Sequence, residues 1–163
     1  MKKITTFSFL IFGCILLYAF TQPQREQKDE IPFPSGYRDW MHVKTAVNNP
    51  MFGSHSGFHH IYANKKAVDG YKTGRFADGS MIVFDVLESI QQKNADIIEG
   101  RRKLIDVMLK DSLKYKETGG WGYQEFVYRD IKILNVLLPT KQQCFNCHAS
   151  QYKNEYIFSK IRN

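Results

Sequence analysis

The chain has 163 residues, of which 43% are hydrophobic, so it is long and apolar enough for one folded domain with a real core. The net charge is +7, but the basic residues are scattered among acidic ones, which is typical of a solvated surface and disfavours a nucleic-acid-binding protein. The aromatic share of 14% suits either a pocket for a large flat ligand or an ordinary β-rich core. The sequence shows neither an internal repeat nor a low-complexity tract.

The first segment has the pattern of an export signal. Two lysines precede an apolar run over 4–20, and a polar stretch with prolines follows. This run is long for a signal core and short for a membrane span, so 1–21 is predicted to be a signal peptide or an N-terminal membrane anchor. Cys14, within the run, is interpreted as a filler rather than a lipoprotein acylation site. The positive start places the rest in the periplasm or at the outer face of a bacterial cytoplasmic membrane. Residues 22–34 are predicted to form a linker, and 35–163 the folded domain.

Local patterns predict a mixture of elements in the first half of that domain. Apolar residues at helical spacing predict a helix over 35–48, ended by Pro50. Residues 58–63 have the composition of a strand. Asn64 is then predicted to cap a short helical turn that ends at Gly70.

The second half is richer in strand patterns. Strands are expected over 80–87, 103–110 and 123–128, a loop over 94–102, and a short helix after Pro139 that carries a pair of cysteines. The segment 103–110 also fits a helix, and 130–138 favours no single element. Hairpin-like strands followed by a helix predict a single α+β domain with a largely antiparallel β-sheet flanked by helices.

Near its C-terminus the chain contains the motif Cys144-Phe145-Asn146-Cys147-His148, a C-x-x-C-H pattern. On a helical turn, two such thiols lie near one edge of a porphyrin and add to its two vinyl groups, and the adjacent histidine binds iron. The motif therefore predicts one covalent haem c, attached through Cys144 and Cys147 and ligated by His148. Haem attachment of this kind takes place outside the bacterial cytoplasm, which agrees with the export signal.

Other interpretations of the cysteine pair fit less well. A zinc site needs four ligands, and no second Cys or His pair is visible. A thioredoxin-like pair belongs near a βαβ unit, and a plain disulfide explains neither the spacing nor His148. Only 15 residues follow His148 and none is Met, which disfavours the common helical electron-transfer cytochromes c. The predicted strands disfavour a four-helix cytochrome c′.

The order of several short motifs resembles the cytochrome P-460 family, which includes the cytochromes c′-beta, over about residues 35–163. The motifs are Tyr37-Arg38-Asp39-Trp40, Gly57-Phe58-His59-His60-Ile61-Tyr62, Phe76-Ala77-Asp78-Gly79-Ser80, Met108-Leu109-Lys110-Asp111-Ser112, Gly119-Gly120-Trp121-Gly122 and the terminal C-x-x-C-H. The resemblance implies a largely antiparallel β fold with flanking helices, a five-coordinate haem c and a homodimer.

The family includes two behaviours. Some members oxidise hydroxylamine, using a lysine cross-linked to the haem edge and a distal carboxylate. The c′-beta members lack the cross-link, have an aromatic cap over the iron and bind nitric oxide or carbon monoxide. The predicted strand 80–87 contains no lysine, and Phe84 stands where the resemblance implies the cross-link or the cap. Lys65, Lys66 and Lys72 are interpreted as surface charges.

The function predicted from these features is an exported monohaem c-type cytochrome whose five-coordinate iron binds nitric oxide or carbon monoxide. One alternative is an oxidoreductase acting on hydroxylamine or nitric oxide. The other is a six-coordinate periplasmic electron carrier that docks with a redox partner protein. The sequence leaves open whether the protein is an enzyme.

Strand alternation suggests what surrounds the distal side of the haem. Phe58, His60 and Tyr62 share one face of their strand, and Phe84 lies on a face of the next predicted strand. We expect Phe58 and Phe84 to contact the haem together, forming an apolar and crowded site that admits diatomic gases. On the Phe58 face, His60 is the main candidate for a sixth ligand.

Weaker distal candidates complete the list. They are His42 and His55 as iron ligands, Asp85 and Glu125 as a distal carboxylate, and Arg38 and Arg75 as partners of a haem propionate. Asp85 and Glu125 are expected to be exposed to solvent, because an unpaired buried carboxylate is costly.

Overall fold

The computed structural model describes residues 31–49, 55–129, 132–136 and 141–161. The chain divides into two compact units, 1–30 and 31–163, of which only the second contains described residues. The predicted signal peptide or anchor therefore lies outside the described residues, as does most of the predicted linker. In the part of the chain that the structure describes, every helix is too short or too polar to cross a membrane.

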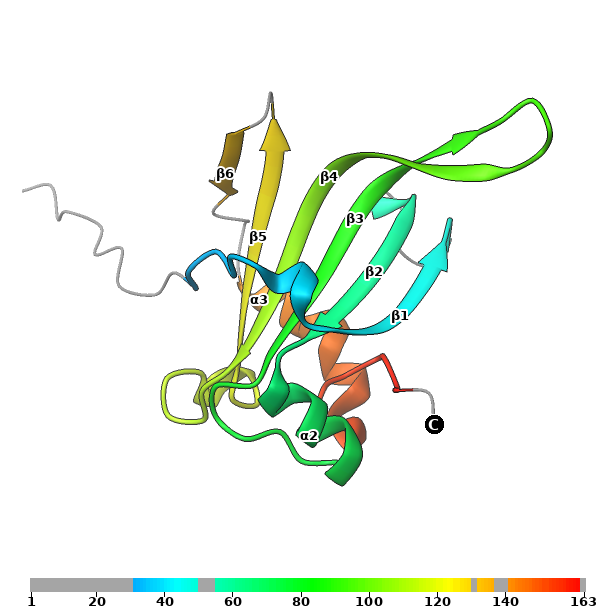
Figure 1. Cartoon of the computed structure of the whole chain (residues 1–163). Helices are drawn as coiled ribbons and strands as arrows, with labels where there is room; N and C mark the ends of the chain where they lie inside the picture. Colours follow the sequence, from blue (N-terminus) through cyan, green and yellow to red (C-terminus); the bar gives the residue numbers. More distant parts are fainter. Residues whose placement is uncertain (1–30, 50–54, 130–131, 137–140, 162–163) are drawn as a thin grey trace, which may run out of the picture. The chain divides into compact units, whose positions relative to one another are not determined.

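The core of the second unit is one six-stranded antiparallel sheet in the order β1-β2-β3-β4-β5-β6, shown in Figure 1. Its strands are β1 (Met41–Val47), β2 (Phe58–Ala63), β3 (Met81–Gln91), β4 (Ile97–Lys110), β5 (Trp121–Arg129) and β6 (Lys132–Val136). The helices are α2 (Lys65–Thr73) and α3 (Lys141–His148), with 3-10 turns η1 (Tyr37–Asp39), η3 (Lys116–Thr118) and η4 (Ala149–Asn154). The predicted α+β class with an antiparallel sheet is confirmed.

The predicted helix over 35–48 is wrong. Only a 3-10 turn forms there, after Gly36 at φ 74°, and the chain then enters strand β1. The β-branched residues Val43, Thr45 and Val47 alternate along this segment, a pattern that favours a strand at least as well as the helical spacing does. Pairing of β1 with β2 decides between the two patterns.

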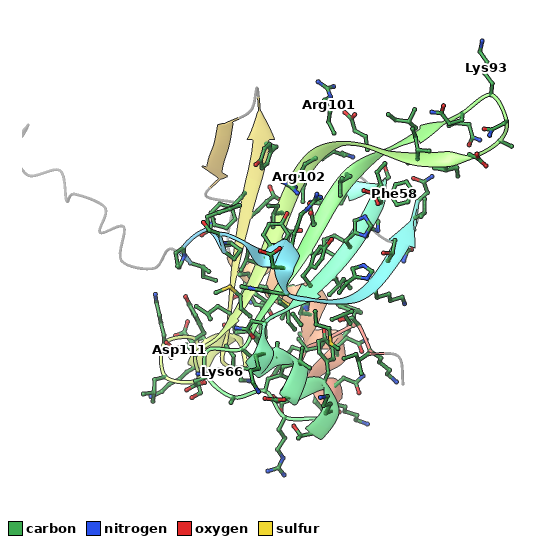
Figure 2. All side chains as sticks on the ribbon, in the orientation of Figure 1. Phe58, Lys66, Lys93, Arg101, Arg102 and Asp111 are labelled. Carbon is green, nitrogen blue, oxygen red and sulfur yellow. The ribbon has the colours of Figure 1, made fainter. Side chains whose placement is uncertain are left out.

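The predicted loop over 94–102 is also wrong for most of its length. Strand β4 already begins at Ile97, and it forms a long hairpin with β3 in which Ile90 pairs with Ile98 and Gln91 with Ile97. The hairpin projects beyond the rest of the sheet in Figure 1, and Lys93 stands at its tip in Figure 2. The polar, glycine-containing sequence of this segment shows no strand pattern by itself, and pairing with β3 makes it part of strand β4.

Other local predictions are confirmed. Strand β2 covers the predicted 58–63, and the short helix α3 carries the cysteine pair. The side chain of Asn64 accepts a hydrogen bond from the Ala67 amide at 2.9 Å and caps α2. This helix runs three residues past Gly70, because the left-handed residue that ends it is Gly74 at φ 74°.

The sheet has two covered faces, with α3 on one and η1 on the other (Figure 1). Ile82, Met108 and Trp121 belong to the core on the α3 face, which also contacts Cys144 and Phe145. The core on the opposite face includes Ile31, Tyr37, Val83, Ile105, Val107, Tyr115 and Phe126. Ile31 is only 2% exposed, so the folded unit begins at least four residues before the predicted boundary.

Candidate functional site

A cavity of about 390 Å³ lies between the α3 face of the sheet and the C-terminal part of the chain. From the sheet it is lined by Ile61, Ile82, Phe84, Asp106, Val107, Met108, Tyr123, Gln124 and Glu125, and from the segment before β2 by His55. From the C-terminal part it is lined by Gln143, Cys144, Cys147, His148, Ile157, Phe158 and Ser159. The cavity is therefore mostly apolar, with all three residues of the C-x-x-C-H motif at its wall and a few polar groups opposite.

Helix α3 presents the two cysteines to the cavity together. Cys144 and Cys147 are three residues apart on one helix, so they lie on the same helical face. Both thiols are free, and Cys144 packs against the core of the α3 face. Burial, with the nearby carboxyls of Asp106 and Glu125, raises the pKa of Cys144 to about 11. The Cys144 sulfur is therefore a neutral thiol at physiological pH.

His148 is held by one ring nitrogen and leaves the other available. Its Nδ1 donates a hydrogen bond to the Tyr156 carbonyl at 2.7 Å, which assigns the Nε2 lone pair to the cavity side. Burial lowers the pKa of His148, so the imidazole is neutral and suited to bind a metal. The rings of Tyr123 and Phe158 each lie 5.1 Å from the imidazole centroid and orient it.

The segment after α3 folds back to supply that carbonyl. Glu155 and Tyr156 both have positive φ values, 53° and 65°, which turn the chain after η4. The ring of Tyr156 sits against Gly119, where a Cβ atom would overlap it, and Gly119 itself has φ 66°. A hydrogen bond of 2.5 Å joins Tyr71 to Ser159 and ties the end of the segment to α2. The close packing at Gly119 thus sets the position of the residue that orients His148.

Sheet register determines what faces the cysteines. Ile61, Phe84, Asp106 and Glu125 are directly paired neighbours in one row across β2, β3, β4 and β5. The next row on the same face runs through Ala63, Ile82, Met108 and Tyr123. Phe84, which is predicted to contact the haem, lies at the cavity wall.

Phe58 and His60 lie elsewhere, and the expectation that Phe58 and Phe84 share a site is corrected. Phe84 pairs with Ile61, and Phe58 lies three residues before Ile61 on β2, so the side chain of Phe58 is on the opposite face of the sheet. It stacks on His60 at 6.0 Å, and Figure 2 shows it at the end of β2 away from α3. His60, on the same face as Phe58, interacts with Thr45 and is therefore not placed to reach iron in the cavity.

The distal carboxylate candidates also separate. Both Asp85 and Glu125 are buried, at 0% and 6% exposed, so the expectation that they face solvent is wrong. Asp85 lies on the η1 face, where Arg102, Arg38 and Tyr37 all bond to it at 2.7–3.1 Å. Arg38 is thus committed to Asp85, and Arg75 is exposed and outside the cavity wall.

Glu125 remains at the cavity, where it is joined by two residues that sequence reasoning missed or ranked low. Its Oε2 lies 3.1 Å from Nε2 of His55, and Asp106 is its direct neighbour on β4. One ligand atom from each of these three residues lies within 4.8 Å of the others. Asp106 alternates with Met108 along β4, a pattern that could have placed both on one face. The sequence alone does not show which face meets the cysteines.

These features fit a haem better than a small ion. Two thiols and a neutral imidazole on one helix are the donor set of a c-type haem motif, and the opposite wall is largely apolar. The hydroxyl of Tyr123 is buried at this wall and has no hydrogen-bond partner among the described residues, as expected where a polar edge of a bound group completes the site. The pocket is that of a haem-binding cytochrome.

The comparison with protein families agrees. The chain belongs to the cytochrome P460 family, whose model matches residues 34–159. The match covers the whole sheet and the C-x-x-C-H motif, so it supports the same haem site that the geometry describes. A search of curated proteins finds no match.

Proposed function

We propose that this protein is an exported cytochrome with a single haem c, attached covalently to Cys144 and Cys147 and bound through iron to His148. The tethered imidazole of His148 carries the proposal, because its hydrogen bond to Tyr156 leaves Nε2 directed to the cavity. Both thiols line the same cavity. When bound, the haem supplies an iron that binds small ligands and changes charge on reduction. Because haem of this kind is attached outside the bacterial cytoplasm, we propose the periplasm or the outer face of the cytoplasmic membrane as the location of the mature protein.

We further propose that the iron is five-coordinate and open to nitric oxide or carbon monoxide. Three apolar residues of the sheet line the cavity wall and offer no donor atom for iron: Ile61, Ile82 and Phe84. His55, which has a donor atom, is bonded to Glu125. The apolar residues also exclude water from the ligand-binding side and leave room for a diatomic molecule.

One residue at the wall favours a second candidate function, a six-coordinate electron carrier. The thioether of Met108 lines the cavity in the row next to Phe84, and Met is a common sixth ligand in electron-transfer haem proteins. Met108 packs in the core with Ile82 and Tyr123 and is 8% exposed, so core packing alone also accounts for this residue. Met108 replaces His60 as the residue to test.

Hydroxylamine oxidation has one feature for it and one against. The carboxyl groups of Asp106 and Glu125 supply acid–base chemistry at the cavity wall. However, the described residues that line the cavity include no lysine, and Lys65, Lys66 and Lys72 are exposed on α2. The cross-link implied by the hydroxylamine-oxidising relatives therefore lacks a donor at this wall.

The test is an optical spectrum of protein matured in a haem-loading bacterial host. We expect haem that resists extraction by acidified acetone, a high-spin five-coordinate ferrous spectrum and a shift on adding carbon monoxide. A low-spin resting spectrum that becomes high-spin in Met108→Leu would establish the electron-carrier alternative instead. His60→Ala is the matched control, because His60 lies on the other face and its loss leaves the spectrum unchanged.

A further inference from the structure

The α3 face of the sheet holds an unusual pair of carboxyl groups. Asp106 on β4 and Glu125 on β5 are directly opposite each other and both line the cavity. One ligand atom of each side chain lies within 4.8 Å of the other, close enough for the two carboxyl groups to repel each other if both are ionised. Two carboxylates at this separation in a buried site do not both ionise without compensation.

The groups around the pair supply one positive partner. His55 bonds to Glu125, and this contact raises the pKa of His55 and favours its charged form. Among the described residues that line the cavity there is no Lys or Arg. The positive charge of Lys103, on β4, lowers the pKa of His55, and its ammonium group donates a hydrogen bond to the Ser56 carbonyl. A buried acid, Glu125, and a partly buried one, Asp106, therefore share one adjacent cation.

Three of the remaining ionisable groups that face the pair, Tyr123, Cys144 and His148, are neutral. From β5 comes Tyr123 and from α3 come Cys144, Cys147 and His148. Burial raises the pKa of Cys144 and of Tyr123 and lowers that of His148. His59, on β2, is also buried with a lowered pKa, and its Nε2 donates to the His55 carbonyl at 2.5 Å. His59 thus helps to position His55 without adding charge.

We propose that Asp106 holds an exchangeable proton in contact with Glu125, and that binding of this proton is linked to reduction of the haem iron. The inference rests on the proposed haem at the same cavity. In balanced form, Asp106 would take one proton from solvent for each electron that a reduced redox partner protein delivers to the bound haem. Asp106 takes up this proton because reduction removes one positive charge from the cavity and leaves the carboxylate less stabilised.

His55 sets the affinity of Asp106 for its proton. Its side chain is 33% exposed at the edge of the site, while that of Glu125 is 8% exposed, so His55 gives the carboxyl pair a contact with solvent. A protonated His55 stabilises the ionised carboxylates and so lowers the pKa of Asp106. Burial and Glu125 have the opposite and larger effect, and the pKa of Asp106 is raised to about 7. Proton uptake therefore falls in the neutral range.

The experiment is a series of reduction potentials of the haem-loaded protein between pH 5 and pH 9. We expect the potential of the wild-type protein to fall as pH rises, approaching about 59 mV per pH unit for one proton per electron. Asp106→Asn keeps the shape of the side chain and removes the proton, so its potential falls less steeply. In His55→Gln the steep region moves to higher pH. Glu117→Gln, the same type of change at an exposed position outside the cavity wall, keeps the wild-type curve.

Several outcomes would overturn the inference. One is a wild-type potential that does not vary with pH in protein that carries its haem, and another is an Asp106→Asn curve that coincides with wild type. A third is one equivalent of a non-haem divalent metal in purified protein that disappears in Asp106→Asn, since the three residues would then hold a metal. Colourless protein would instead remove the proposed function itself. An unchanged Soret band in each variant shows that the haem pocket has folded.

Discussion

The two faces of the sheet bury carboxyl groups in opposite ways. On the η1 face, Asp85 is fully buried and receives hydrogen bonds from two guanidinium groups and a phenol. On the α3 face, the buried Glu125 and the partly buried Asp106 have His55 as their one close cationic partner among the described residues. The first carboxyl group is paired with two guanidinium groups, whereas no guanidinium or ammonium group lines the cavity at the second site. The difference marks the α3 face as the chemically responsive one.

The largest effect on the free energy of unfolding is expected from removing the carboxylate that pairs with two arginines on the η1 face. Asp85→Asn leaves the mostly buried Arg102, 18% exposed, without its carboxylate partner, while the half-exposed Arg38 can turn to solvent. We expect a loss of about 3 kcal/mol in the free energy of unfolding, measured by urea denaturation. The haem spectrum of the folded variant stays that of wild type, because Asp85 faces away from the cavity. A changed spectrum at low denaturant would show that the two faces are not independent.

The next effect tests how the α3 face positions its imidazole. Gly119→Ala introduces both a strained positive φ and an overlap with the ring of Tyr156, whose carbonyl holds His148. We expect a loss of about 2 kcal/mol in unfolding free energy and a disturbed iron-ligand spectrum. Gly74→Ala is the matched control, since Gly74 also has φ 74° but open space around it, and costs about 1 kcal/mol with a normal spectrum. Equal effects of both substitutions on the spectrum would contradict the role of Tyr156.

A smaller effect concerns pH and the proton on Asp106. The pKa of Asp106 is raised to about 7 from an ordinary value near 3.8, so its contribution to stability is fully present below about pH 4 and is lost as pH rises through 7. Asp106→Asn stays neutral at every pH. Its stability relative to wild type therefore increases between pH 5 and pH 8, by about 1 kcal/mol or more. Urea denaturation at the two pH values measures this difference, and a difference that does not change with pH would refute the assignment.

The smallest effect separates the two phenylalanines. Phe84→Leu makes room at the cavity wall and changes the affinity for carbon monoxide by about threefold, less than 1 kcal/mol. Phe58→Leu, on the opposite face, leaves this affinity unchanged. Titration of the ferrous proteins with carbon monoxide gives both values. If Phe58→Leu had the larger effect, the assignment of the two faces would be reversed.

Sequence reasoning succeeded where the signal is local. Strand β2, the Asn64 cap and the cysteine-bearing helix each depend on residues a few positions apart, and each was predicted. The segment over 35–48 failed because helical and strand spacings coexist in it, and only pairing with β2 selects the strand. The hairpin around 94–102 failed for the same reason.

By itself, the sequence determined the cofactor-binding motif and the family resemblance, because the spacing of Cys144, Cys147 and His148 encodes its chemistry within one helical turn. The tertiary structure decided which residues face that motif. Phe84 and Phe58 lie on neighbouring strands, yet the register of β2 against β3 sends them to opposite faces. The same register brings Asp106 beside Glu125 and leaves Asp85 among arginines, because strand pairing joins residues that are far apart in the chain.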